Sequence, residues 1–414
     1  MGKLLLALVA ILTTLLPARA QEEVRFWHAL RGSRGEALQR LVEEYNRAHS
    51  GPRIVAVFKG ADQPGGNDYA ALNRALLESL ALGTPPDLAQ VYENWTPQLL
   101  EIGALTPLDG FFEGSDGLTT GEQQDFVTVF RQANLFQGRL VTLPFNKSIY
   151  VLYYNRPLFE KLGLSPPQSY QALRETARTI HAKTGLPGLV AEPTVDLFGH
   201  YLVAHGGSFV VGNQAVFGGQ LGEQGMSFWA SLASEQSSVF APDAADRFGR
   251  GQAGMYIETT SKLAGLERHL PGLGVAPLPR GSSPAVQAAG TNLAIFSRAT
   301  PAAQKAAWGF VKWVTSPEIT ARWATETGYL PVRLSAIQSP AYQAFLKQHP
   351  NYAVGLSELR HAVVQPRTPA WESIRGILDD ALTLSVSGKL PPEEAVQRAL
   401  ALANEVLTRL QGQP

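Results

Sequence analysis

LPFNKSIYVLYYNRPLFEKLGL, residues 143–164, is the stretch that decides the fold. A loop at Pro144 to Lys147 is expected to lead into Ile149 to Tyr154, an apolar, aromatic and β-branched run that is typical of a buried strand. Asn155 and Pro157 then predict the start of a short helix, because proline is tolerated in the first turn. A strand buried on both faces needs helices to cover it, so the chain is predicted to be α/β.

Strands and helices alternate in the sequence before this stretch. Val24 to His28 and Ile54 to Phe58 are predicted strands, and the apolar residues between Leu38 and Tyr45 have the spacing of a helix. A second helix opens at Tyr69 and leads into a third predicted strand, Asp87 to Tyr92. The loops that follow these strands fall on one edge of a parallel sheet. In open α/β sheets that edge is where ligands bind.

The length of the chain predicts two lobes. Single hydrophobic cores stop growing beyond roughly 250–300 residues, and this chain has 414. We expect an N-terminal lobe of residues 21–135 plus about 284–328, and a C-terminal lobe of about 136–283 plus about 329–414. The sequence has no low-complexity linker, which is expected if the chain crosses between the lobes more than once.

The amino terminus predicts export. Lys3 precedes an uncharged apolar run from Leu4 to Leu16, and Ala18-Arg19-Ala20 supplies the small residues of a cleavage site. Residues 1–20 are therefore predicted to be a cleavable signal peptide, since a transmembrane helix needs about 20 apolar residues. The mature chain is expected to be periplasmic, and no lipid anchor is expected on it because the sequence contains no cysteine.

Composition excludes several classes of function. Without cysteine there are no disulfides, catalytic thiolates or cysteine-ligated zinc sites. The chain has 35 basic and 35 acidic residues, and removal of Lys3 and Arg19 leaves 33 against 35, a net charge of −2. That balance indicates no nucleic-acid partner.

Motifs of enzymes are missing from the sequence. It contains no G-x-S-x-G, G-x-x-x-x-G-K-[ST], H-E-x-x-H or G-x-G-x-x-G pattern. His200 and His205 are five residues apart and do not share a helix face, and the adjacent Asp379 and Asp380 point in different directions on a helix. The residues therefore favour ligand binding without catalysis, and they predict neither a metal nor a cofactor.

Several short stretches together resemble one protein family. They are FWHAL (26–30), FKG (58–60), QVYE (90–93), PFNKS with VLYYN (144–155), ETGYLP (326–331) and the segment 367–382. The chain thus resembles the family 1 extracellular solute-binding proteins of ABC importers, and among them the periplasmic binders of glycerol-3-phosphate. The resemblance implies a type II periplasmic binding protein fold: two lobes, each a mixed sheet flanked by helices, with the ligand in the cleft between them. It also implies a monomer that closes on its ligand and docks on membrane permease subunits.

The resemblance implies a set of pocket residues. Glu93 would accept hydrogen bonds from glycerol hydroxyls, and the other positions would hold a phosphate, with Arg367 as the permanently charged group. The full set is Tyr69, Glu93, Ser148, Asp196, Thr259, Thr260, Ser261, Gly290, Tyr329 and Arg367. Residue chemistry agrees with it, because an arginine fork with hydroxyls and backbone N–H groups supplies the donors that a phosphate ester needs.

One departure from the family concerns the ligand's head group. Where relatives carry a pocket tryptophan, this chain has Asp196 or Leu197. A smaller side chain leaves room for a head group, and Asp196 would attract a choline or ethanolamine cation. The hypothesis is therefore a glycerophosphodiester ligand such as glycerophosphocholine.

Two alternatives remain open at the level of sequence. A maltose- or trehalose-like disaccharide would be favoured if Trp27, Trp95 and Tyr329 stack on sugar rings and Arg367 points away. A secreted phosphodiesterase is the other alternative, but the sequence offers it no recognisable nucleophile, base pair or metal cluster.

Overall fold

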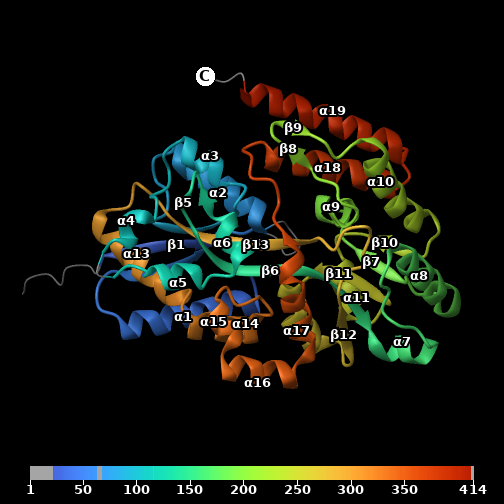
Figure 1. The fold of residues 1–414 in the computed structure, drawn as a ribbon, viewed down its shortest axis with the longest axis horizontal. Helices are drawn as coiled ribbons and strands as arrows, with labels where there is room; N and C mark the ends of the chain where they lie inside the picture. The colour runs from blue at the N-terminus through green and yellow to red at the C-terminus, as the bar shows by residue number, and fades with distance from the viewer. Residues whose placement is uncertain (1–21, 63–67, 115, 412–414) are drawn as a thin grey trace, which may run out of the picture.

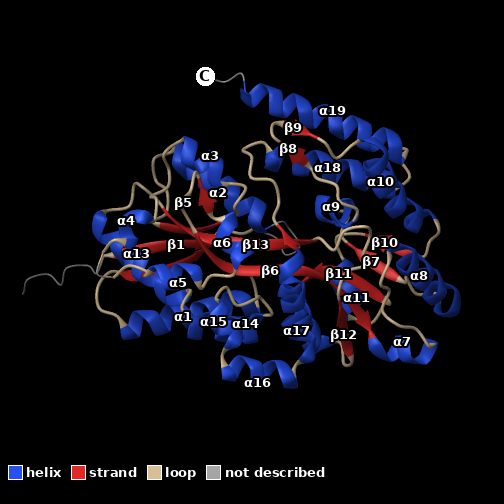
Figure 2. Cartoon of the chain, in the orientation of Figure 1, coloured by secondary structure: helices blue, strands red, loops and turns tan. Residues whose placement is uncertain are grey.

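The computed structural model describes residues 22–62, 68–114 and 116–411. The predicted signal peptide, residues 1–20, lies outside them. The described chain folds into two lobes around one large mixed sheet that carries helices on both sides (Figures 1 and 2). This is the two-lobe α/β architecture that the sequence predicts.

The large sheet runs through both lobes. Its strands are β1 (Glu23–His28), β2 (Arg53–Phe58), β3 (Leu88–Val91), β6 (Leu143–Asn155), β7 (Leu189–Ala191), β10 (Ser238–Phe240), β11 (Met255–Thr259), β12 (Leu273–Ala276), β13 (Val286–Ile295) and β14 (Ala362–Val363). The order is β10-β7-β11-β6-β13-β3-β1-β2, while β12 pairs with β6 and β14 with β13. Two short hairpins lie apart from it: β4 (Leu135–Phe136) with β5 (Arg139–Leu140), and β8 (Val210–Val211) with β9 (Gln214–Ala215).

Helices cover the sheet in both lobes (Figure 1). Around β1, β2 and β3 are α1 (Ser33–Ala48), α2 (Asp68–Ala81), α3 (Thr96–Glu101), α4 (Asp109–Phe112), α5 (Thr120–Gln124), α6 (Thr128–Ala133), α13 (Pro301–Val314), α14 (Pro317–Thr327) and α15 (Leu334–Gln338). The others are α7 (Arg156–Leu162), α8 (Tyr170–Thr184), α9 (Val195–Ala204), α10 (Gly219–Ser234), α11 (Ala244–Gly249), η1 (Thr260–Lys262), α12 (Leu263–His269), α16 (Pro340–Gln348), α17 (Pro350–Glu358), η2 (Leu359–His361), α18 (Trp371–Val386) and α19 (Pro392–Gln411).

Two long strands, β6 and β13, join the halves of the sheet. The first part of β6 pairs with β13, and its second part, from Tyr150, pairs with β11 and β12. β13 in turn pairs with β3 from Asn292 to Ile295. The predicted lobe boundaries, after residues 135 and 283, fall shortly before these two strands and stay a prediction.

The start of β6 differs from the sequence expectation. Residues 144–147 were expected to form a loop, but they belong to the strand. Pairing with β13 explains the difference, because Asn146 and Lys147 find partners in Thr291 and Gly290. The register shifts between Thr291 and Asn292, an irregularity of the kind that accommodates a proline at the beginning of a strand.

Local signals in the sequence explain where the neighbouring elements begin and end. The α7 helix starts as predicted, because the Asn155 side chain accepts a hydrogen bond from the Leu158 N–H, and it ends at Gly163, whose φ is 66°. α1 buries Leu38, Leu41 and other apolar residues at helical spacing. These caps and faces fix the ends of the strands, and so the edge at which ligands can bind.

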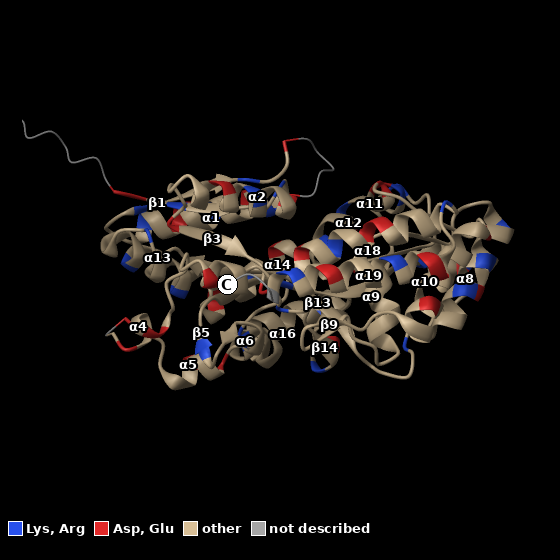
Figure 3. Cartoon of the chain, turned by 90° about the horizontal axis from the view of Figure 1, so that it is seen from above, with Lys and Arg blue, Asp and Glu red and all other residues tan. Residues whose placement is uncertain are grey.

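Charge is spread over the whole molecule. In Figure 3, basic and acidic residues alternate over the helices of both lobes, in keeping with their equal totals. None of the helices within the described residues is long and apolar enough to span a bilayer. In the same part of the chain, no three His, Asp or Glu side chains gather as a metal-ion site.

Candidate functional site

A cleft of about 750 Å³ lies between the two halves of the sheet. Its walls include residues that come just after parallel strands: Ala29 after β1, Tyr92 after β3, Glu192 after β7 and, two residues beyond its end, Pro242 after β10. The cleft therefore lies at the edge of the sheet where the sequence predicts a ligand, and both lobes contribute to it.

Seven of the ten predicted site residues line this cleft. They are Tyr69, Ser148, Asp196, Thr259, Ser261, Gly290 and Tyr329. The structure brings them together from segments that are far apart in the sequence. Both Asp196 and Leu197 line the wall where the sequence left a choice between them.

The crossing strands β6 and β13 form the floor. On β6, Ser148 and Tyr150 face the cleft because alternate residues of a strand share a face. Ser148 is 2% exposed, and its hydroxyl has no hydrogen-bond partner among the described residues. On β13, Gly290 has φ 103°, and a Cβ at this position would lie 2.0 Å from the carbonyl oxygen of Asn146. Only glycine lets the two crossing strands approach this closely.

An arginine without a carboxylate partner reaches the cleft from the first turn of α1. The Nη1 atom of Arg34 lies 3.4 Å from both the Ser261 hydroxyl and the Tyr329 hydroxyl. The Tyr69 hydroxyl is 3.4 Å from that of Tyr329. No described carboxylate lies within ion-pair distance of Arg34, and the neighbouring Tyr329 raises its pKa, so the guanidinium stays charged. The four side chains form a cationic corner rich in hydroxyl donors.

A second arginine in the cleft is neutralised by an acid. Arg375 on α18 forms an ion pair of 3.0 Å with Asp196 on α9. The Gln365 amide donates a hydrogen bond to Asp196 and accepts one from Arg375. Burial alone would raise the pKa of Asp196, but Arg375 outweighs that effect and holds the pKa below its usual value. From the sequence, Asp196 was predicted to attract a cationic head group. Its charge is already balanced by Arg375, which corrects that expectation.

Two further carboxylates line the wall on the side of β7 and β11. Glu192 and Glu258 face the cleft, and neither forms an ion pair within the described residues. Burial, helped by the charge of Glu258, raises the pKa of Glu192 to about 7. Carboxylates in this setting accept hydrogen bonds from ligand hydroxyls or attract a cation.

Glu93 does not line the cleft. Its carboxylate lies beneath the floor, 2.9 Å from the Lys147 ammonium and 3.2 Å from the Asn292 amide. Lys147 also donates to the carbonyl oxygen of Gly290. Burial lowers the pKa of Lys147 although Glu93 counteracts it. The Glu93–Lys147 pair supports the crossing strands from below. The family resemblance implied that Glu93 contacts glycerol hydroxyls, and its position beneath the floor corrects that expectation.

Thr260 and Arg367 are also outside the cleft. Thr260 turns its side chain toward α17, where Gly355 leaves room for its methyl group. Arg367 is exposed and donates to three backbone carbonyls at the end of α6, those of Gln132, Ala133 and Leu135. Its guanidinium caps a helix C-terminus, so it does not meet Ser148 across a ligand in this structure.

Several side chains in the cleft were not predicted from the sequence, among them Arg34, Tyr92, Tyr150 and Arg375, as well as the acids Glu192 and Glu258. Arg34 follows the first strand, and Tyr92 ends the third, so the edge rule alone could have found both. Tyr150 shares the strand face of Ser148, which the period of two predicts. Arg375 lies within the segment of family resemblance, but no local signal distinguishes it from Arg367.

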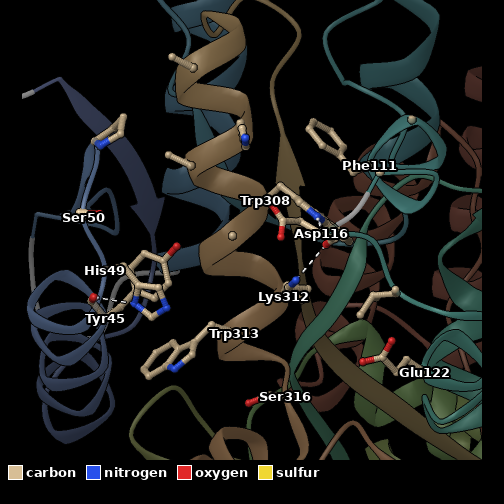
Figure 4. Close-up of a pocket in the computed structure, with 18 of the residues that line it drawn as sticks. Tyr45, His49, Ser50, Phe111, Asp116, Glu122, Trp308, Lys312, Trp313 and Ser316 are labelled. Carbon is tan, nitrogen blue, oxygen red and sulfur yellow. Dashed lines mark hydrogen bonds between the residues drawn. The ribbon is translucent and has the colours of Figure 1, made fainter.

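A second hollow of about 1020 Å³ lies within one lobe, between α1, α13 and α4 (Figure 4). Its aromatic rings are stacked on one another, Tyr45 on His49 and Phe111 on Trp308. The Trp308 indole and the Lys312 ammonium both donate to the carbonyl of Asp116. Its groups are thus satisfied within the protein, while the cleft holds unpaired donors and acceptors from both lobes. The cleft is the candidate site.

Comparison with known proteins agrees with this choice. The sequence profile of the family described as bacterial extracellular solute-binding proteins matches residues 40–351. The sn-glycerol-3-phosphate-binding periplasmic protein UgpB of Yersinia enterocolitica is 25% identical over 422 residues, covering 95% of this chain and 94% of its own. The UgpB of Pectobacterium atrosepticum is 24% identical, covering 95% and 93%.

Solved structures include binders of different ligands. UgpB from Mycobacterium tuberculosis, in complex with glycerophosphocholine, has a TM-score of 0.84 at 22% identity and covers 94% of this chain and all of its own. The cyclic alpha-maltosyl-1,6-maltose binding protein from Arthrobacter globiformis has a TM-score of 0.77 at 25% identity, with the same coverage. At 22% identity, the similarity to the Mycobacterium tuberculosis protein shows the fold alone. Because the two neighbours bind different ligands, the ligand of this chain has to be inferred from its cleft.

Proposed function

The chain belongs to the bacterial extracellular solute-binding proteins, and we propose that it captures a glycerol phosphate or a glycerophosphodiester. Proteins of this family bind small molecules and deliver them to ABC permeases. The names of the UgpB relatives, which match nearly the whole chain, support a glycerol-phosphate ligand. Delivery to permease subunits in the membrane is part of the proposal.

Arg34 is the observation that carries the proposal. It is a partly buried cation with no described carboxylate partner, and the hydroxyls of Tyr69, Tyr329 and Ser261 lie around it. An unpaired guanidinium in a cleft attracts an anion, and phosphate oxygens accept from guanidinium and hydroxyl donors together. Thr259 adds a fourth hydroxyl, 2.9 Å from that of Ser261.

The rest of the cleft suits the hydroxyl-bearing part of such a ligand. The unpartnered Ser148 hydroxyl points into the cleft next to the crossing strands. Glu192 and Glu258 stand on the opposite wall as acceptors. A phosphodiester head group that carries a cation would be attracted to these two acids, which replace Asp196 in that role.

Binding is proposed to close the lobes. Arg34 on α1 and Ser261 on η1 belong to different halves of the molecule and meet at 3.4 Å. Arg268 on α12 likewise donates to Ser33 at 3.1 Å. A phosphate held between Arg34 and Ser261 would favour the arrangement with these contacts, because a ligand shifts the population toward the state that it binds better.

A disaccharide is the second candidate. The cleft has four tyrosine rings and unpaired carboxylates, which are suited to sugar hydroxyls and faces, and the Arthrobacter globiformis neighbour is a maltosyl-maltose binder by name. Of the conditions set for a disaccharide, Arg367 does point away from the cleft and Tyr329 does line it. Stacking by Trp27 and Trp95 has no support, because neither lines the cleft. Trp27 lies under the Lys59 ammonium and Trp95 packs on Tyr92.

A thermal-shift panel tests the proposal. The mature chain is heated with sn-glycerol 3-phosphate, glycerophosphocholine, maltose or trehalose, since a ligand of the native state raises the melting temperature with concentration. We expect the phosphate esters to raise it and the sugars to leave it unchanged. A rise with maltose alone would favour the second candidate. Product formed from glycerophosphocholine in a parallel turnover assay would favour an enzyme instead.

Export is the remaining part of the proposal. Residues 1–20 have the pattern of a signal peptide, and the UgpB relatives are periplasmic by name. Mass spectrometry of the protein secreted to the periplasm should give an N-terminus at Gln21. An uncleaved N-terminus at Met1 would contradict it.

A further inference from the structure

A chain of buried polar side chains runs beneath the cleft to Tyr69. Gln90 on β3, Asn146 on β6 and Thr291 on β13 each have 0% of their surface exposed. Gln90 and Thr291 both donate to Asn146 Oδ1, at 2.9 and 2.5 Å. The other end of the Asn146 amide, Nδ2, is 3.1 Å from the Tyr69 hydroxyl. None of these three buried residues was expected in the site.

A backbone N–H fixes which group donates and which accepts in each of these side-chain hydrogen bonds. The amide of Ala29, a cleft residue after β1, donates to Gln90 Oε1 at 2.8 Å. A backbone N–H can only donate, so Gln90 must turn its oxygen to Ala29 and its NH₂ to Asn146. Asn146 must then turn its oxygen to Gln90 and its NH₂ to Tyr69. The orientation of both amides thus follows from hydrogen-bond logic and needs no observed hydrogen atoms.

The consequence concerns the proton of Tyr69. Its hydroxyl oxygen accepts a hydrogen bond from Asn146, so its own proton points away from the floor. The directions left to it are the Tyr329 hydroxyl at 3.4 Å and the open cleft. Burial raises the pKa of Tyr69, which therefore keeps its proton at neutral pH.

We infer that Asn146 is a positioning residue that holds Tyr69 as a hydrogen-bond donor toward the ligand. Such a donor suits phosphate oxygens, which at neutral pH only accept, whereas a tyrosine that accepted from the ligand would leave them without this hydrogen bond. The inference rests on the proposed phosphate ligand for this match. The orientation of Tyr69 itself does not depend on that ligand.

The substitution Asn146→Asp reverses the hydrogen bond between residue 146 and the Tyr69 hydroxyl, while the side chain keeps nearly the same shape. A carboxylate still accepts from Gln90 and Thr291, but it has no NH₂ to offer, so Tyr69 must donate to it and loses its proton for the ligand. We expect calorimetry to show sn-glycerol 3-phosphate binding about 10- to 100-fold more weakly, the range for one hydrogen bond to a charged group. Circular dichroism and thermal melts verify that the variant is folded.

A double-mutant cycle with Tyr69→Phe separates this effect from the charge of the new carboxylate. The charge acts whether or not Tyr69 has a hydroxyl, while the reversed hydrogen bond needs it. Asn146→Asp is therefore expected to weaken binding several-fold more in the wild-type background than in Tyr69→Phe. Equal factors in the two backgrounds would overturn the inference.

A ligand-free measurement keeps the inference separate from the proposed function. Neutron diffraction from deuterium-exchanged crystals of the wild-type protein locates the Tyr69 deuteron and the Asn146 amide deuterons. We expect the amide deuterons on the side of Tyr69 and the phenol deuteron away from Asn146. A phenol deuteron between Tyr69 and Asn146 would overturn the inference. If the wild-type protein binds neither sn-glycerol 3-phosphate nor glycerophosphocholine, the proposed function fails, and this measurement still decides the role of Asn146.

Discussion

Charged side chains in the cleft are of two kinds, paired and unpaired. Arg375 and Asp196 form an ion pair of 3.0 Å and neutralise each other. Charges that are already paired attract a charged ligand only weakly. Arg34 and Glu192 have no such partners among the described residues. Arg34 gives the cleft a cationic corner, while the other wall holds the acids Glu192 and Glu258 with the Lys262 ammonium near them, which suits a ligand with an anionic group and hydroxyls.

Glu192 predicts a pH dependence of stability. In the folded chain its carboxyl keeps a proton up to about pH 7, while the unfolded chain releases it near the ordinary value of 4.5. Between these values the folded state binds more protons, so raising the pH lowers the free energy of unfolding. Replacement by glutamine removes this contribution. Urea titrations at pH 5 and pH 8 should show the wild type losing about 1–3 kcal/mol more than Glu192→Gln over that interval.

Other titrating groups act on both proteins equally, so the comparison isolates Glu192. His200 is one such group, since burial lowers its pKa to about 4. Asp379 is another, because burial raises its pKa to about 6. Parallel pH profiles of the wild type and Glu192→Gln would contradict the assignment.

Individual site residues were predictable where a local rule applied. The family resemblance implied Tyr69, Ser148 and Tyr329, the last two within its short motifs, and the structure brings all three to the cleft. Arg367 and Arg375 show where prediction of site residues from the local sequence ends. Both belong to one segment, and only the packing of α18 against α9 and of the preceding loop against α6 decides which one reaches the cleft. Such long-range packing leaves no signal in the local sequence.

At the scale of elements, the crossing strands place the site. β6 and β13 approach closely at Gly290, where a Cβ would meet the Asn146 carbonyl oxygen. Most strands and helices follow from hydrophobic period and turn residues, but the true start of β6 does not. Residues 144–147 look like a loop by themselves, and they become a strand because β13, more than 140 positions later, offers hydrogen-bond partners.

Gly290→Ala tests the close approach. The substitution forces a side chain into a left-handed backbone and against the carbonyl oxygen of Asn146, so we expect the free energy of unfolding to fall by about 2–4 kcal/mol. Ligand affinity should fall as well, because the floor must shift. Denaturant titration and calorimetry measure the two effects.

Gly376→Ala is the matched control for this substitution. Gly376 lies inside α18, and nothing is within 4 Å of the position of an added Cβ. Alanine there should stabilise the chain by about 0.5–1 kcal/mol through helix propensity. If Gly290→Ala leaves the free energy of unfolding unchanged or raises it, as this control does, β6 and β13 do not approach each other as closely as described.

At the scale of the whole molecule, length correctly predicts two lobes, and we propose that their relative placement changes when the ligand binds. The proposed closure brings Arg34 and Ser261 from opposite halves to one phosphate. Small-angle X-ray scattering should therefore give a smaller radius of gyration for the wild type with saturating sn-glycerol 3-phosphate than without it. Arg34→Met should show no change at the same ligand concentration. An unchanged radius in the wild type, at a concentration where calorimetry shows saturation, would exclude closure.

Calorimetric titration of sn-glycerol 3-phosphate into the wild type, Arg34→Met and Arg367→Met tests the central claim most directly. Both substitutions remove a guanidinium and keep a long side chain, but only Arg34 faces the cleft, while Arg367 caps α6. We predict that Arg34→Met weakens binding by about 100-fold or more, the cost of removing a charged partner that the bound ligand shields from water, and that Arg367→Met binds as the wild type does. Wild-type affinity in Arg34→Met, or loss of binding in Arg367→Met alone, would contradict the account.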